Sequence, residues 1–411
     1  MTAPVLDHAR LIDRLQRLGA IGRGPSGGPT RLALSDADRA GRDLLAGWMR
    51  EAGLEVRVDR IGNIFGLWPA AGGADPVMIG SHIDTVIDTG IYDGCYGVLA
   101  GLAVVEALRD AGAPPSRPVA VAAFANEEGV RFQPDMMGSL VHAGGLDLET
   151  ALATIGTDGA VLGAELARIG YAGDLEPGSI RPACYLELHI EQGPVLEAEG
   201  LAIGAVDSLQ GISWQRVTIT GAANHAGTTP ITARRDAGLA AARVIAHLRD
   251  RVAGANAGTL ATVGSLRLEP DAINVIPSRA VFTVDLRDPD EGRLQAAEAA
   301  LAGYLETLAA AEGVAVATER LARFEPVRFD PKLVRRVAEA AERRGHRWRH
   351  ITSGAGHDAQ MIARIAPSAM IFVPSRGGIS HNPAEFTAPE QLAAGADVLL
   401  DVVAGLVGVE A

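Results

Sequence analysis

The stretch from residue 76 to residue 108, PVMIGSHIDTVIDTGIYDGCYGVLAGLAVVEAL, decides how we expect this chain to fold. It opens with an apolar run at Val77–Ile79, which predicts a buried strand, and closes with a long Ala/Leu/Val helix that begins near Gly94. The polar turn between them carries His82, Asp84 and Asp93. Because side chains alternate along an extended segment, His82 and Asp84 point to the same side, which suits a metal-bound imidazole held from behind by a carboxylate. Asp93 offers a second ligand. The alternative for this stretch alone is a solvated loop.

Further apolar runs along the chain also end in polar residues. The run at 118–124 is followed by Glu127 and Glu128, and the run at Tyr185–Ile190 contains His189 near its end. Apolar strands that alternate with helical segments predict an α/β domain with a mostly parallel sheet. Because ligands bind at the carboxyl ends of strands in such sheets, we expect these polar residues to form a site.

The pattern changes from Gly211 onward. The segments that follow predict the order β-α-β-β-α-β, with strands at 212–220, 261–268, 280–287 and 314–320, which is the ferredoxin-like α+β arrangement. After it the α/β pattern resumes with a helix, a strand at Ala369–Val373 and a block that contains His381. We therefore expect an α/β domain made of residues 1–210 and 329–411, with an inserted domain at 211–328. Two domains are also the natural expectation for 411 residues.

Composition excludes several classes of protein. The formal charge of −13 argues against binding to nucleic acid or to anionic membrane surfaces, which need basic patches. No apolar run reaches membrane-spanning length, and the first residues lack the apolar core of a signal peptide. Two cysteines, Cys95 and Cys184, are too few for a disulfide framework. We therefore expect a cytoplasmic protein, and the net charge by itself indicates no partner.

The candidate ligands form a set of three imidazoles and two carboxylates: His82, Asp93, Glu128, His189 and His381. Such a set suits zinc, manganese or cobalt. Five ligands exceed one tetrahedral site but fit two ions that share a carboxylate. Two such ions can hold a hydroxide between them and polarise a carbonyl oxygen. Glu127 would remain free to act as the general base. Each of these residues alone has an ordinary structural explanation, such as a core histidine or a helix-capping acid.

Read together, these blocks resemble a known family. GSHIDTV, YDG, NEEG, LHIEQG, NHAGTTP and SHNPAE are similar to the signature blocks of the M20 metallopeptidase clan, and they occur in the family's order over essentially the whole chain. The more specific resemblance is to the amidohydrolase branch of N-carbamoyl-L-amino acid hydrolases, β-ureidopropionases and allantoate amidohydrolases.

The resemblance assigns a role to each residue of the predicted centre. It implies that His82 and Glu128, with Asp93 as the bridge, are joined by His189 and His381 to complete two metal sites. Glu127 matches the general base, and Asp84 matches the carboxylate behind the first histidine. The family pattern also implies a cis peptide bond after Asp93.

The inserted domain resembles the family's lid and dimerisation module, so the resemblance implies a homodimer. His225 matches a residue that stabilises the oxyanion. Four further residues match substrate-binding positions: Gln192, Gln210, Asn274 and Arg287. Arg287 suits a substrate carboxylate because a guanidinium binds one bidentately, although a surface salt bridge is the alternative.

We expect hydrolysis of an N-carbamoyl-L-amino acid to the free amino acid, carbon dioxide and ammonia. Asn126, before the two glutamates, looks more like the carbamoylase pattern than the allantoate one. The alternatives are an allantoate amidohydrolase, a β-ureidopropionase, an aminoacylase or dipeptidase of the same clan, and a non-catalytic binding protein that has kept the fold. The native metal stays open between zinc, manganese and cobalt.

Overall fold

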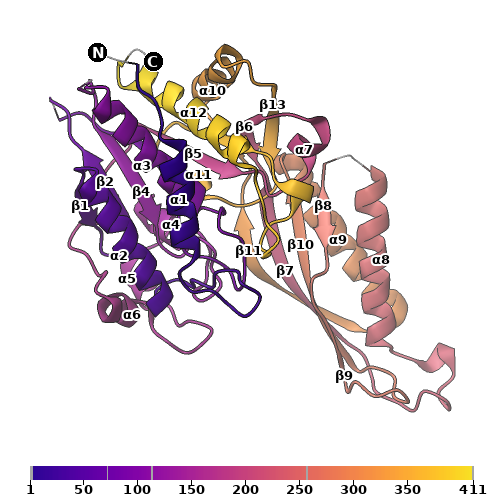
Figure 1. Cartoon of the computed structure of the whole chain (residues 1–411). Coiled ribbons are helices and arrows are strands. Elements are labelled where there is room, and N and C mark those ends of the chain that lie inside the picture. The colour runs from indigo at the N-terminus through magenta and orange to yellow at the C-terminus, as the bar shows by residue number, and fades with distance from the viewer. Residues whose placement is uncertain (1–2, 72, 113, 256–257, 410–411) are drawn as a thin grey trace. The chain divides into compact units, whose positions relative to one another are not determined.

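The computed structural model describes residues 3–71, 73–112, 114–255 and 258–409, and the chain divides into two compact units (Figure 1). The first unit comprises Met1–Asp207 and Arg328–Ala411, and the second comprises Ser208–Val327. The architecture is mixed α/β, with a large sheet in the first unit. No helix among the described residues is long and apolar enough to cross a membrane.

The large sheet has the strand order β1-β2-β4-β3-β5-β14-β6-β12, and β13 also pairs with β6. Its strands are β1 (Glu55–Val58), β2 (Ile64–Trp68), β3 (Val77–His82), β4 (Val119–Phe124), β5 (Cys184–Ile190), β6 (Ile203–Leu209), β12 (Val327–Arg328), β13 (Trp348–Ser353) and β14 (Ser368–Val373). Strands β3, β4, β5 and β14 are buried along their whole length. This explains why their sequences are continuous apolar runs rather than alternating ones.

The sheet is parallel only at its centre. Strands β4, β3, β5 and β14 pair in parallel, whereas β1 with β2, β2 with β4, and β14 with β6 pair antiparallel. The expectation of a mostly parallel sheet therefore describes the centre, and the sheet as a whole is mixed. At the edge of the sheet formed by β1 and β2, the antiparallel pairing has a local cause. A turn through Gly62 (φ 88°) joins these two strands and folds them back on each other.

The helices of the first unit are α1 (His8–Gly19), α2 (Asp36–Glu51), α3 (Cys95–Asp110), α4 (Met137–His142), α5 (Leu148–Leu152), α6 (Leu162–Ile169), α7 (Val195–Glu199), α10 (Pro331–Arg343), α11 (Asp358–Ile362) and α12 (Pro389–Leu406). Helix α3 packs on β3, β4 and β5, and α1 and α12 pack on α3. Nearly every residue of α3 is buried, as its apolar circumference predicts. Residues 76–108, with which the sequence analysis began, thus contain β3 and most of α3, a central strand and a central helix of this unit.

The second unit has the order β-α-β-β-α-β that the sequence predicts, with one difference. Its described elements are β7 (Gly211–Thr220), the 3-10 helix η1 (Ile231–Ala233), α8 (Ala237–Ala255), β8 (Leu260–Thr262), β9 (Leu266–Glu269), β10 (Arg279–Asp288), α9 (Glu291–Glu312) and β11 (Ala315–Phe324). The predicted single strand 261–268 is divided into β8 and β9. The antiparallel sheet has the order β11-β7-β10-β8, with β9 beside β10.

One face of this smaller sheet packs against its helices. Val217 and Ile219 of β7 and Phe282 and Val284 of β10 are buried there together with apolar residues of α8 and α9. Side chains alternate along each strand, so the intervening residues of β10, Asp285 and Arg287 among them, lie on the opposite face.

Candidate metal centre

The carboxyl ends of four neighbouring strands carry most of the predicted ligands. His82 is the last residue of β3, and His189 is the last but one of β5. Glu127 and Glu128 follow β4, and His381 lies in the loop after β14. Because these strands run in parallel, their carboxyl ends meet at one edge of the sheet. Asp93 reaches the same place from the loop just before α3.

His82, Asp93 and His189 form the first cluster of possible metal ligands. The Oδ1 atom of Asp93 lies 3.5 Å from Nε2 of His82 and 3.1 Å from Nε2 of His189. All three side chains are buried. The Nδ1 atoms of both histidines lie near backbone carbonyls, Asp84 O at 3.0 Å for His82 and Ile190 O at 2.8 Å for His189. These carbonyls favour the tautomer that leaves Nε2 as the ligand atom.

Asp93, Glu128 and His381 form the second cluster. Here the other carboxylate oxygen of Asp93, Oδ2, lies 3.2 Å from Nε2 of His381. The same nitrogen lies 3.4 Å from Oε2 of Glu128. The two oxygens of Asp93 therefore face different clusters, which is the arrangement of a bridging carboxylate.

The spacing of these atoms fits divalent ions. Ligand atoms bound tetrahedrally at about 2.0–2.1 Å from one ion lie roughly 3.3 Å apart. The four nitrogen–oxygen distances within the two clusters run from 3.1 to 3.5 Å, and two of them exceed the usual hydrogen-bond length. The imidazole and carboxylate donors also match the ligands that zinc, manganese and cobalt prefer. The five residues therefore fit two ions with a shared carboxylate.

The electrostatics of the clusters favour positive charge between the side chains. Burial alone raises the pKa of Asp93, but its contacts with His189, His381 and His82 hold that pKa well below its usual range. Burial lowers the pKa of His82, yet Glu127, Asp93 and Asp84 together raise it well above its usual range. The hydrogen bond with Asp93 raises the pKa of His381 to about 9. The two histidines hold their protons tightly and Asp93 stays ionised, because the negative charge of the carboxylates that does this would also attract a cation.

Glu127 lies beside the first cluster rather than within it. Its Oε2 atom is 3.4 Å from Nε2 of His82, and the side chain is 9% exposed. Burial, together with the nearby charges of Asp358, Glu128 and Asp93, raises the pKa of Glu127 well above its usual range. A carboxylate with a raised pKa at the edge of a metal cluster suits a group that accepts and returns a proton.

Asp84 differs from the expectation in the way it supports His82. Its carboxylate is 3.8 Å from Nδ1 of His82, too far for a hydrogen bond, and its backbone carbonyl takes that place. The carboxylate instead accepts the backbone N–H groups of Glu127 and Glu128, at 3.2 and 3.3 Å. Asp84 therefore ties the loop after β4 to the end of β3.

The peptide bond after Asp93 differs from the family pattern, which implies that it is cis. Among the described residues the cis peptide bonds are at Gln133–Pro134 and Glu269–Pro270 and not after Asp93.

The predicted substrate-binding residues are distributed over both units. Gln192, in the first unit, donates from Nε2 to Oδ2 of Asp93 at 2.7 Å and so contacts directly the carboxylate that the two clusters share. Gln210, His225, Asn274 and Arg287 belong to the second unit.

Within the second unit, three of these residues have local contacts that order them. The segment of His225 pairs with Val275 in a β-bridge, which brings His225 and Asn274 close together. Arg287 donates from Nε and Nη2 to Asp285, its neighbour on the same face of β10, at 3.0–3.2 Å. The structure places the metal candidates together in one unit and the remaining substrate-binding candidates in the other.

Sequence reasoning missed two buried residues at this site. Glu385 accepts the backbone N–H groups of Tyr92 and Asp93, and burial together with the charge of Asp93 raises its pKa to about 7. His357 packs edge-on against the ring of His189, with 4.5 Å between ring centroids, and forms a further possible ligand group with His189 and Glu187. Glu385 lies in the SHNPAE block, four residues after the candidate ligand His381, and that proximity was the available signal. His357 has no candidate ligand near it in the sequence.

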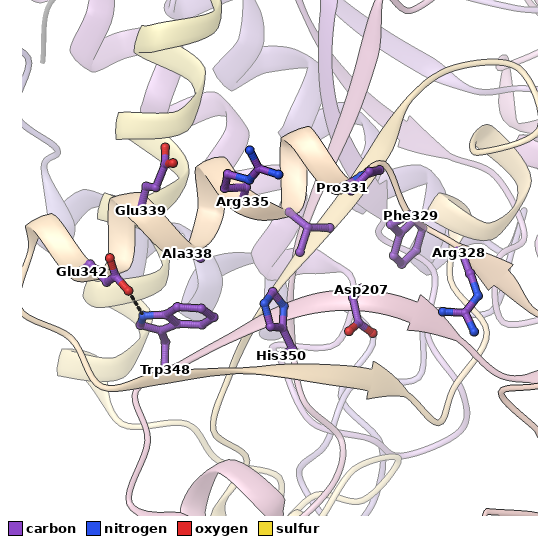
Figure 2. A pocket seen from close by; sticks show the side chains of 11 residues that line it. Asp207, Arg328, Phe329, Pro331, Arg335, Ala338, Glu339, Glu342, Trp348 and His350 are labelled. Atoms are coloured by element: carbon purple, nitrogen blue, oxygen red, sulfur yellow. Dashed lines mark hydrogen bonds between the residues drawn. The ribbon is translucent and has the colours of Figure 1, made fainter.

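A separate cavity of about 630 Å³ lies between α10 and the strands β6 and β13 (Figure 2). Trp348 and His350 project into it from β13, and Trp348 Nε1 donates to Glu342 of α10 at 3.2 Å. None of the predicted site residues is among the described residues that line it. This cavity is therefore not the metal centre.

Comparison with known proteins matches this chain to one family. The sequence profile described as Peptidase family M20/M25/M40 matches residues 78–405. An N-carbamoyl-L-amino-acid amidohydrolase of Rhizobium meliloti is 43% identical over 96% of this chain and 95% of its own length. An allantoate amidohydrolase of Bacillus subtilis is 34% identical, with 96% of each chain covered. The crystal structure of an amidase of the hydantoinase/carbamoylase family from Burkholderia multivorans superposes with a TM-score of 0.93 at 45% identity, covering 99% of each chain.

Proposed function

The chain belongs to the peptidase family M20/M25/M40, and on that premise we propose that it hydrolyses N-carbamoyl-L-amino acids to the free amino acid, carbon dioxide and ammonia. It is a hydrolase that acts on C–N amide bonds, as its relatives are named. The observation that carries the proposal is the joint presence of near-full-length similarity to an N-carbamoyl-L-amino-acid amidohydrolase and two ligand clusters that share Asp93.

We propose that the two clusters hold two divalent ions, with His82 and His189 on one side of Asp93 and Glu128 and His381 on the other. When bound, the ions supply Lewis acidity toward the ureido carbonyl and toward a water molecule. The native ion is zinc, manganese or cobalt, since the donor set suits all three.

We assign proton transfer, stabilisation of the oxyanion and substrate binding to individual residues of the chain. Glu127 takes the proton of the attacking water and returns it to the leaving nitrogen, because its position beside His82 puts it within reach of the reacting atoms. His225 donates to the carbonyl oxygen as negative charge develops there. Arg287 binds the substrate carboxylate bidentately, and Asp285 already orients its guanidinium. Gln192, Gln210 and Asn274 contact the rest of the substrate.

Among the alternatives, an allantoate amidohydrolase or a β-ureidopropionase hydrolyses the same ureido group in a substrate whose remaining part is different. Relatives named N-carbamoyl-L-amino-acid amidohydrolase are 33–43% identical to this chain and the allantoate amidohydrolase is 34% identical, so the upper end of the first range favours the carbamoyl substrate. An aminoacylase or dipeptidase of the same clan would cleave acyl or peptidyl amides instead. The presence of both ligand clusters and of Glu127 argues against a non-catalytic binding protein.

We propose in addition that residues 211–328 form a lid and dimerisation domain on a catalytic domain made of 1–210 and 329–411. On this proposal the protein is a homodimer, and the lid closes by a hinge at Gln210–Gly211. Small sheets present edges that need covering, and the sheet in this unit has β11 at one edge and β8 and β9 at the other. The two buried cysteines are free thiols, as expected for a cytoplasmic enzyme.

A substrate screen tests the proposal. The purified protein is assayed for ammonia release with N-carbamoyl-L-amino acids, N-carbamoyl-β-alanine and allantoate, and for carboxylate release with N-acetyl-L-amino acids and dipeptides, each with manganese, cobalt or zinc. We expect the highest kcat/KM with an N-carbamoyl-L-amino acid, little turnover of its D-enantiomer, and complete loss after chelation. A higher kcat/KM for allantoate or for an acylated amino acid would replace the proposed substrate.

A further inference from the structure

Glu385 is a buried carboxylate whose two oxygens both bind the loops that carry candidate ligands. Its Oε1 accepts the backbone N–H of Tyr92 at 3.2 Å and that of Asp93 at 3.4 Å. Its Oε2 accepts the hydroxyl of Ser380 at 2.9 Å. The side chain is 5% exposed, so these contacts are made in a site from which water is largely excluded. Buried carboxylates are costly unless such donors compensate them.

These contacts connect two parts of the chain that are far apart in sequence. Tyr92 and Asp93 precede α3, whereas Ser380 and Glu385 lie 287 to 293 residues further on. Ser380 Oγ also lies 3.2 Å from Oδ2 of Asp93, the oxygen that faces His381. Asp93 is therefore held at its backbone by Glu385, and Ser380, whose single hydroxyl proton goes to the nearer oxygen of Glu385, lies beside the Asp93 side chain.

The loop that carries His381 needs such support. His381 has a φ of 53°, in the left-handed region that a residue with a side chain rarely adopts, and such strain persists only where the surroundings impose it. A turn in which Glu385 N–H donates to Asn382 O at 2.9 Å brings the Glu385 side chain back toward Asp93. On the other side, a Cβ atom at Gly90 would overlap the Glu385 carboxylate, so the chain leaves room for this group by using glycine there.

We propose that Glu385 is a positioning residue that fixes the bridging carboxylate of Asp93 for both metal ions. The proposal rests on the two-ion centre of the proposed function but not on any substrate. Because Asp93 faces both clusters, displacing it weakens both ions together. Removal of groups that orient metal ligands typically lowers metal affinity by about 10- to 100-fold.

Metal binding to the purified chain tests this role without an activity assay. Zinc is added back to the chelated protein, and zinc equivalents per chain and their affinities are measured for wild type, Glu385→Ala and Glu385→Gln. We expect Glu385→Ala to weaken both equivalents by at least about tenfold, in parallel. Glu385→Gln keeps an oxygen that can accept the Tyr92 and Asp93 N–H groups, so it should recover most of the affinity.

Two further variants separate positioning from general stability. Asp59 is also a buried carboxylate that accepts backbone N–H groups, those of Ile61 and Asn63, but it belongs to neither cluster. Asp59→Ala should lower the melting temperature of the metal-free chain and leave zinc affinity unchanged. Gly90→Ala keeps Glu385 but crowds its carboxylate, and should weaken zinc as Glu385→Ala does.

Unchanged affinity for both zinc equivalents in Glu385→Ala and Gly90→Ala would overturn the proposal. So would an equal loss of zinc in Asp59→Ala, because the effect would then follow stability. Neither result would change which substrate the screen identifies, and a failed substrate screen would not change the measured zinc affinities. The failure of this role and the failure of the proposed function are thus distinguishable.

Discussion

At the scale of single residues, Glu127 is the side chain whose loss should separate chemistry from binding. It lies next to His82 but in neither ligand cluster. We expect Glu127→Gln to keep metal and substrate affinity and to lower kcat by about 10²–10⁴, the usual contribution of a general base. Single-turnover rates and zinc content of the same preparation measure the two effects separately.

Glu191 provides the matched control for this change. It is as buried as Glu127, at 8% exposed, and its carboxylate accepts the backbone N–H groups of Val195 and Leu196 in α7. Glu191→Gln should keep turnover within a few-fold of wild type. Near-normal turnover of metal-loaded Glu127→Gln would show that another group takes the proton.

Arg287 should decide how tightly the substrate carboxylate is held. Arg287→Lys keeps the charge but loses the planar fork, so KM should rise about tenfold, equivalent to about 1.4 kcal/mol, with a smaller change in kcat. Arg216 lies on the same face of the sheet and pairs with Glu319 at 2.6 Å, which makes Arg216→Lys a suitable control with unchanged KM. An unchanged KM in Arg287→Lys would assign the substrate carboxylate to a different group.

Residue types and their places near strand ends predicted that five side chains lie close together, and the structure places them in two clusters that share Asp93, while their role as metal ligands stays a prediction. They were not enough to predict which atoms bond to which. The carboxylate of Asp84 binds backbone N–H groups rather than His82, and Glu385 reaches Tyr92 across 293 residues of sequence. Such contacts depend on how distant loops close in three dimensions, and no local pattern in the sequence reports that.

At the scale of elements, the start of α3 is built around a glycine. Gly94 has a φ of 61°, and a Cβ atom there would overlap the imidazole of His82. We expect Gly94→Ala to push His82 from its place and to weaken the ion on the His82–His189 side by more than about tenfold. Zinc titration of the chelated protein measures this loss.

Gly47 makes a matched control because it lies inside α2, where an added Cβ atom meets nothing within 4 Å. Gly47→Ala should stabilise the chain by about 0.5–1 kcal/mol through the better helix propensity of alanine and leave zinc binding unchanged. If Gly94→Ala binds both ions as wild type does, His82 does not depend on that turn.

The elements themselves were largely predictable, because buried strands and amphipathic or apolar helices each carry a period in the sequence. The direction of strand pairing was not. Strand β6 pairs antiparallel with β14, which it precedes in the chain by more than a hundred residues, and its own apolar pattern is the same for either direction. The division of residues 261–268 into β8 and β9 likewise depends on pairing with β10.

At the scale of the whole molecule, the proposed dimer makes a prediction about shared sites. His225 belongs to the second unit and all five metal candidates to the first. If His225 completes the site of the partner subunit, inactive Glu127→Gln and inactive His225→Ala chains should restore activity when mixed, because some heterodimers carry both lesions in one site and neither in the other. When equal amounts exchange at random, half of the dimers are heterodimers, and each of these has one intact site out of two. The expected recovery is therefore up to about a quarter of the wild-type activity per chain.

Subunit exchange itself has to be followed independently, for example with two different affinity tags. Mixing His225→Ala with wild type is the control, since it reports any change caused by exchange alone. If tagged chains exchange and the two inactive variants recover no activity, His225 acts within its own subunit.

The unequal exposure of the two clusters has a consequence for how the centre is loaded. The side chain of His381 is 49% exposed, whereas that of His82 is 1% exposed. An ion on the His381 side should therefore trade places with ions in the surrounding solution much faster than its buried neighbour. Brief exposure to a different metal would then yield a mixed centre with one old and one new ion. In a purified sample, the ion beside His82 would then be the one bound during synthesis. The ion beside His381 would be the one supplied by the last buffer.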